Sequence, residues 1–217
     1  MLALRAYARY FLPFTLLSVL TFSPLLVYVF ALPAPLDVSQ ARQLLKLEWL
    51  VVAAAWFLQL WLVAAVAPAL RRDRVTQVAA FVGGAANLVR MAIPWLVAIA
   101  AILIGAVALV IPAFVLIVLL ALTGASVAEG MPAPLHDSIA VVRANLRAVI
   151  VTVVAIVVVD LAVAGVVYLV VFAPFAKKPT PDQLAAARQI VRVVAVALAL
   201  ISPLAAAVLA AIRVRAR

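Results

Sequence analysis

Residues 91–128 form an unbroken run of 38 positions without a single Asp, Glu, Lys or Arg. One helix of that length would extend about 57 Å, nearly twice the roughly 30 Å thickness of a bilayer's hydrocarbon core. Two membrane-crossing helices joined by a tight turn fit the run better. Pro112 favours a turn there, because proline lacks a backbone donor and disfavours helical geometry in the residue before it.

The composition extends this inference to the whole chain. Of its 217 residues, 71% are hydrophobic and 11% are charged, whereas a soluble globular domain is about half apolar and about a quarter charged. A water-soluble fold of this size could not hide so much apolar surface. We therefore predict an all-α fold, a polytopic transmembrane helix bundle whose main solvent is lipid.

Stretches of about 20 mostly apolar residues, the length that a membrane-spanning helix needs, recur along the chain. They predict six spans in a single transmembrane domain over residues 1–217, at 11–32, 49–70, 92–110, 112–128, 148–172 and 190–212. Short amphipathic segments are expected before the odd-numbered spans. Before the third span, Val75, Val78 and Val82 recur at helical spacing, as in an interfacial helix.

Basic residues predict the orientation in the membrane. Six spans divide the 17 Lys and Arg into eleven on one side and six on the other. The larger set comprises Arg5, Arg9, Arg71, Arg72, Arg74, Arg90, Arg143, Arg147, Arg213, Arg215 and Arg217. Because cytoplasmic loops carry the excess of Lys and Arg, we expect a protein of the cytoplasmic (inner) membrane with both termini cytoplasmic. Anionic lipids at that face are then the expected partners of the net charge of +10.

Nucleic acid is not an expected partner of this basic chain. No basic run with interleaved aromatic residues, the pattern of a nucleic-acid groove, occurs outside the predicted spans. The positive charge is better explained by residues that flank membrane helices.

Asp160 is the one acidic residue near the middle of a predicted span. A carboxylate at that depth costs at least a few kcal/mol and must face protein or water. Two interpretations remain open: a proton or cation site, or a protonated or hydrogen-bonded residue that joins helices, with Gln59, Ser202 or Thr152 as partner. With a single such acid in six spans, the structural interpretation is favoured.

Residues suited to catalysis or metal binding are sparse. The chain has no Cys and a single histidine, His136, which Glu129 and Asp137 flank in a predicted loop. The segment from Gly124 to Ser126 is similar to the serine motif of intramembrane proteases, but serine catalysis needs a base beside the hydroxyl, and His136 lies outside the predicted spans. We therefore expect no metal, no cofactor and no enzyme activity.

Short motifs are spread over most of the chain: Ile111-Pro112, Glu129-Gly130, Ser138, Arg143-Ala144-Asn145, the stretch from Tyr7 to Phe11, Ser202-Pro203-Leu204 and the stretch from Ile212 to Arg215. Together they resemble a group of bacterial six-helix membrane proteins, which includes the membrane domain attached to some glycerophosphoryl diester phosphodiesterases. One departure is Ala210-Ala211, where the family often has an aromatic-acidic pair.

The resemblance implies six helices, a hairpin at Pro112 and a structural motif at the cytoplasmic face formed by Glu129, Gly130, Ser138 and Arg143. It implies no catalytic activity for these residues, because the catalytic domain of those enzymes is not among them.

A non-catalytic membrane component or accessory subunit, bound to a membrane-protein partner or to a second copy, is the function that these features favour. A small transporter or channel is the chief alternative, because transporters use interrupted helices and internal repeats around a midplane site. Asp160 supplies such a midplane site. The spacing between Arg9 and Pro13 recurs between Arg90 and Pro94, which suggests an internal repeat. A membrane-embedded enzyme is the third alternative.

Overall fold

The structure is a computed structural model that describes residues 2–33, 38–71, 75–108, 110–172 and 181–215. These residues are almost entirely helical, and no strand occurs among them, so the predicted all-α fold is confirmed for this part of the chain. The helices are α1 (Leu2–Arg9), α2 (Phe11–Ala31), α3 (Val38–Arg71), α4 (Gln77–Ala108), α5 (Val110–Leu120), α6 (Thr123–Ala128), α7 (Pro134–Ala144), α8 (Leu146–Phe172) and α9 (Pro181–Arg215).

Five segments in these helices are long and apolar enough to cross a membrane. They are Phe11–Ala31 in α2, Leu50–Arg71 in α3, Gln77–Ala106 in α4, Leu146–Val166 in α8 and Arg188–Arg215 in α9. Exposed side chains on them are largely aliphatic, as lipid-facing surfaces require.

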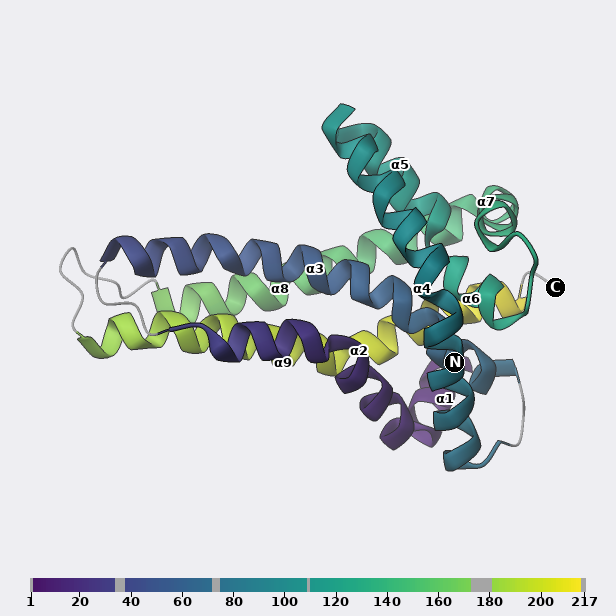
Figure 1. Ribbon diagram of the computed structural model, residues 1–217, viewed down its shortest axis with the longest axis horizontal. Coiled ribbons are helices and arrows are strands. Elements are labelled where there is room, and N and C mark those ends of the chain that lie inside the picture. Colours follow the sequence, from purple (N-terminus) through teal and green to yellow (C-terminus); the bar gives the residue numbers. More distant parts are fainter. Residues whose placement is uncertain (1, 34–37, 72–74, 109, 173–180, 216–217) are drawn as a thin grey trace.

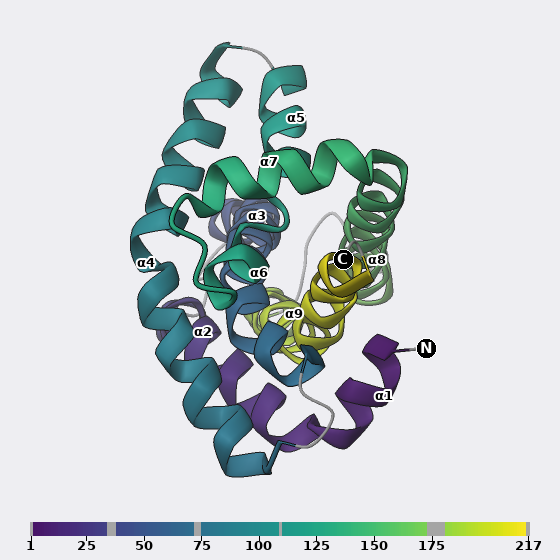
Figure 2. The same cartoon turned by 90° about the vertical axis from the view of Figure 1, so that its right-hand side faces the viewer.

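Helices α2, α3, α8 and α9 run alongside one another and form an elongated bundle (Figure 1). Helices α3 and α9 lie at its centre and make the most extensive helix–helix contact in the described chain. Helix α1 and the last turns of α9 lie at the same end of the bundle, where α6 and α7 also sit (Figures 1 and 2). We call this the α6–α7 end.

The hairpin of α4 and α5 departs from this arrangement. Helix α4 crosses the bundle steeply, and its far end points away from the other helices together with α5 (Figures 1 and 2). Its two arms approach closely at Gly105, where an added Cβ would lie 3.2 Å from the backbone nitrogen of Ala113. Pro112, predicted as the turn, lies in the first turn of α5, where a missing N–H is tolerated. Leu109, between the two helices, lies outside the described residues.

Residues 112–128, predicted as the fourth span, do not form a single helix. A turn at Ala121 and Leu122 separates α5, which has 11 residues, from α6, which has 6. Eleven residues extend only about 16 Å, roughly half of a hydrocarbon core. The break is stabilised by Ser138 of α7, whose hydroxyl donates to the carbonyl of Leu119 at 2.8 Å and so satisfies an acceptor at the end of α5.

The amphipathic segment expected before the third span is likewise not a separate helix. Residues 77–90 are the first half of the continuous helix α4. Short separate helices do precede the first and fifth predicted spans, as α1 and α7. Of the segment between the fifth and sixth predicted spans, residues 173–180 lie outside the described residues.

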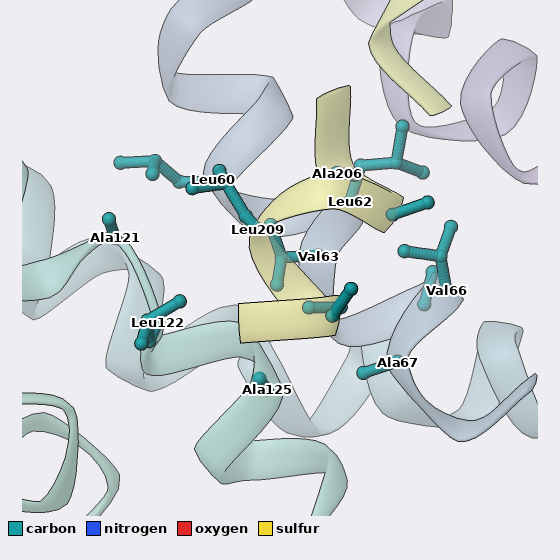
Figure 3. Close-up of a cluster of buried hydrophobic side chains, with 14 of the residues drawn as sticks. Leu60, Leu62, Val63, Val66, Ala67, Ala121, Leu122, Ala125, Ala206 and Leu209 are labelled. Atoms are coloured by element: carbon teal, nitrogen blue, oxygen red, sulfur yellow. The ribbon is translucent and has the colours of Figure 1, made fainter. Parts of the chain in front are cut away.

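Small side chains build the core where α3, α6 and α9 meet (Figure 3). The buried residues labelled there are Leu60, Leu62, Val63, Val66, Ala67, Ala121, Leu122, Ala125, Ala206 and Leu209. At Gly124 of α6 an added Cβ would lie 2.6 Å from the backbone nitrogen of Ala64, so only glycine permits this approach to α3. Small residues at contacts between membrane helices allow such close packing.

Candidate functional site

Gln59, Asp160 and Ser202 come together inside the bundle, each from a different helix. They lie on α3, α8 and α9, and their exposed fractions are 2%, 1% and 0%. The Gln59 side-chain nitrogen donates to Asp160 Oδ2 at 3.1 Å and to Ser202 Oγ at 3.0 Å. The structure thus places the three residues of the predicted intramembrane polar site in one cluster, which we call the polar tie.

Hydrogen bonds in the polar tie form a chain that ends at a backbone carbonyl of α9. The Gln59 amide uses both of its N–H groups, and the Ser202 hydroxyl donates in turn to the carbonyl of Leu198, one turn earlier in α9. The indole of Trp56, one turn before Gln59 in α3, lies near the Asp160 carboxylate. Each of these polar groups therefore has a partner, as burial in an apolar environment requires.

A small cavity of about 230 Å³ reaches Asp160 from between α8 and α9. The other residues in its wall are apolar: Ala155, Ile156, Val159, Ile201, Leu204 and Ala205. Thr152, the other partner considered for Asp160, lies elsewhere, in the wall of a larger cavity nearer the α6–α7 end. Chemically, the polar tie can hold three helices in register, and Asp160 is the one titratable side chain among its three residues.

A second polar cluster lies at the α6–α7 end, around Arg213 of α9. Its guanidinium makes two hydrogen bonds to Glu129 Oε2, at 3.1 and 2.8 Å, and approaches Asp137 Oδ2 to 2.7 Å. The Arg213 side chain is 5% exposed and that of Glu129 is 2% exposed. Arg71, at the end of α3, lies 4.0 Å from the other oxygen of Glu129. This ion cluster therefore joins α3, α6, α7 and α9.

The sequence around Glu129 explains how that carboxylate is presented. Gly130 has φ +73°, a conformation that glycine adopts without strain. Its N–H donates to the carbonyl of Val127, and the N–H of Met131 donates to that of Ser126. This pair of bonds is the Schellman motif that ends many helices. It terminates α6 directly after Glu129, whose side chain faces Arg213.

The four residues predicted as a cytoplasmic-face motif have different places. Glu129 is in the ion cluster, Gly130 ends α6, and Ser138 holds the end of α5. Arg143 is exposed in the last turn of α7 and does not join the other three. At that position it interacts favourably with the helix dipole.

Arg213 was not among the predicted site residues, although the sequence holds a signal for it. Ser202, Ala206, Leu209 and Arg213 recur at steps of four, three and four, which places them on one face of α9. All four are buried. A charged residue on a small and apolar stripe indicates an inward-facing cation, whereas Arg215, two residues on, is exposed.

Two tryptophans that the sequence analysis did not single out as a pair connect α3 to α4. The rings of Trp61 and Trp95 are 4.6 Å apart between centroids, with an interplanar angle of 33°. Each indole N–H donates to a backbone carbonyl of the opposite helix, Trp61 to Leu88 and Trp95 to Phe57, both at 2.8 Å. No short-range pattern reveals this pairing, because the two residues are far apart in the sequence.

Metal ligands do not gather anywhere in the described part of the chain, where no group of three His, Asp or Glu residues is placed to hold an ion. His136 is exposed on α7. In comparisons with known proteins, no family model, curated protein or solved structure matches this chain.

Proposed function

We propose that this chain is a non-catalytic integral membrane protein that acts as an accessory subunit of a larger membrane assembly. The observation that carries the proposal is the polar tie. The buried acid Asp160 accepts a hydrogen bond from the Gln59 amide, which also donates to Ser202. These contacts use the polar groups for helix assembly, which favours a structural role for Asp160.

The outer surfaces of two elements fit this proposal. On α8, Val151, Val158 and Val166 are exposed, and on α4, Val89 and Ile104 are exposed. Aliphatic side chains such as these suit lipid or another membrane helix. An accessory subunit would use part of this surface against its partner.

The proposal also includes a topology. The chain has six membrane segments in the cytoplasmic membrane of a bacterium, and both termini are in the cytoplasm. The segments 92–110 and 112–128 would form a hairpin that enters and leaves on the same side. Arg5, Arg71, Arg147 and Arg215 all belong to elements that meet at the α6–α7 end, and an excess of Arg favours that end as the cytoplasmic one. The proposal also includes a relationship between this chain and the membrane domain of glycerophosphoryl diester phosphodiesterases, which its short motifs resemble.

A small transporter or channel is the second candidate. The observation that favours it is the cavity of about 230 Å³ that reaches Asp160 between α8 and α9. Pro68, Pro94 and Pro203 lie inside α3, α4 and α9, but each of these helices continues through its proline, so they are not the interrupted helices that many transporters use. This candidate requires Asp160 to exchange a proton or cation, whereas the accessory-subunit proposal does not.

Native mass spectrometry of the protein, extracted in mild detergent from its own membrane, tests the lead proposal. We expect a second polypeptide in fixed stoichiometry with this chain. Stepwise activation in the gas phase should release it intact, as a subunit held by non-covalent contacts. A chain that leaves the membrane alone, at every detergent concentration that keeps it folded, would contradict the accessory role.

A further inference from the structure

A cavity of about 850 Å³ opens at the α6–α7 end, between α1, the junction of α7 and α8, and the end of α9. Figure 2 views this end and shows α1, α8 and α9 around the region. Leu4 contributes one wall, Val151 and Ala148 another, and Val208 and Ile212 the third. The walls are therefore mainly aliphatic, and three separate parts of the chain build them.

The mouth of this cavity carries two cations. Arg147, in the first turn of α8, and Arg215, in the last turn of α9, both line it and are both exposed. Among the described residues, neither guanidinium pairs with a carboxylate, because Glu129 and Asp137 are engaged with Arg213. Two unpaired guanidinium groups beside an apolar cavity favour an anionic group with an apolar body.

The backbone adds donors at the same place. The first intrahelical hydrogen bond of α8 runs from the Val149 N–H to the carbonyl of Asn145, so the N–H groups of residues 146–148 precede it and are free in a helix start of this kind. These residues line the cavity. They contribute to anion binding, but the two arginines and the cavity carry the inference.

The smaller cavity that reaches Asp160 lies farther along the same contact between α8 and α9, which we call the seam. Val151 of α8 lines the large cavity and Ala155, one turn on, lines the smaller one; on α9, Val208 and Leu204 stand in the same relation. The seam runs from Arg147 to Asp160, which is about 20 Å along the helix. That length exceeds one leaflet's half of a hydrocarbon core of roughly 30 Å.

We propose that this seam is a binding site for an anionic glycerophospholipid of the adjacent leaflet. The phosphate lies between Arg147 and Arg215, and one acyl chain lies along α8 and α9 toward Asp160. Guanidinium groups bind phosphate oxygens through paired hydrogen bonds, and basic pockets between membrane helices suit anionic headgroups. A free phosphate would leave the apolar seam unfilled, so the acyl chain is part of the ligand. The proposal needs only the membrane location of the helices and is independent of any partner subunit.

The test compares lipids and variants on the purified full-length protein in detergent. Phosphatidylglycerol, phosphatidylcholine with the same acyl chains, and inorganic phosphate are titrated separately, and thermal unfolding and native mass spectrometry report binding. We expect phosphatidylglycerol to bind more tightly than phosphatidylcholine. Arg147→Gln and Arg215→Gln should each weaken its binding about fivefold, and the pair roughly 30-fold, at about 1 kcal/mol per basic residue.

Arg143→Gln is the matched control, because Arg143 is an exposed arginine at the same end that does not line the cavity. Binding by this variant should equal that of the unchanged protein. Val151→Trp, at an exposed position of the seam, should block the acyl chain and weaken binding without loss of either arginine. Equal binding of both lipids, an effect of Arg143→Gln as large as those of Arg147→Gln and Arg215→Gln, or the same response to inorganic phosphate would overturn the proposal.

Discussion

Gly83 and Gly84 are neighbours in α4, yet their surroundings are opposite. A Cβ added to Gly84 would lie 2.5 Å from Leu17 Cδ1 and 2.7 Å from the carbonyl oxygen of Ala65, whereas a Cβ on Gly83 would meet nothing within 4 Å. The Leu17 side chain can rotate away. The Ala65 oxygen belongs to the backbone of α3, so a methyl group at Gly84 must push α4 and α3 apart.

The two substitutions are expected to have different effects on the free energy of unfolding. Gly84→Ala overpacks a tight contact, which costs about 1–3 kcal/mol. For a chain of this length each kcal/mol lowers the unfolding midpoint by about 2–4 °C, so we expect a decrease of roughly 2–12 °C. Gly83→Ala removes a flexible residue from the interior of a helix and should be neutral or stabilising, by up to about 1 kcal/mol.

Thermal unfolding of both variants in the same detergent measures the difference, with tryptophan fluorescence as the readout, because Trp61 and Trp95 lie in the contact between α3 and α4. A fall in the midpoint for Gly84→Ala alone agrees with the structure. Equal midpoints for the two variants would refute the reasoning, since they would show that α4 does not approach α3 at Gly84.

Three further sets of substitutions test the contacts that hold the fold together, and the free energy of unfolding is measured for each. Arg213→Met removes the arginine that pairs with the buried Glu129 side chain and with the partly exposed Asp137, and it should cost about 3–5 kcal/mol. Arg143→Met, at an exposed site, should stay within about 0.5 kcal/mol. Comparable losses would contradict the buried ion cluster. Gln59→Leu and Ser202→Ala, made alone and combined, test the hydrogen bond between these two side chains. Their effects on the free energy of unfolding should be coupled by about 0.6 and at most about 1.7 kcal/mol. Strict additivity would argue against the hydrogen bond. Gly130→Ala puts a side chain at φ +73° and should cost about 1–2 kcal/mol. The control, Gly165→Ala, has nothing within 4 Å of the added Cβ and should cost far less. A neutral Gly130→Ala would speak against the Schellman motif.

The long apolar helices were predictable because their signal is local. Length and apolarity alone locate the long helices, and the mid-span position of Asp160 requires buried partners, of which Gln59 and Ser202 are in contact in the structure. The break at Leu122 was not predictable in this way. No proline or charge lies there, and the turn depends on a hydrogen bond from Ser138, which comes from another helix.

The pairing in the ion cluster was likewise not predictable from the local sequence. Glu129 was predicted to share a motif with Arg143, and Arg143 and Arg147 are the arginines within 20 residues of it in the sequence. Its partner Arg213 is 84 residues away, and the pairing depends on how α9 packs against α6. The wall of the cavity of about 850 Å³ at the α6–α7 end is likewise assembled from α1, α8 and α9, so no local sequence pattern could identify it.

The role of Asp160 is tested most directly by proton flux into liposomes that contain the purified protein. A pH gradient is imposed, a potassium ionophore prevents a membrane potential, and an enclosed pH-sensitive dye reports the dissipation. Asp160→Asn keeps the size of the side chain and one hydrogen-bond acceptor for Gln59 but removes the titrating group. A structural polar tie predicts that the unchanged protein and Asp160→Asn both dissipate the gradient at the rate of protein-free liposomes. Faster dissipation by the unchanged protein, abolished in Asp160→Asn, would contradict this account and make Asp160 a proton site.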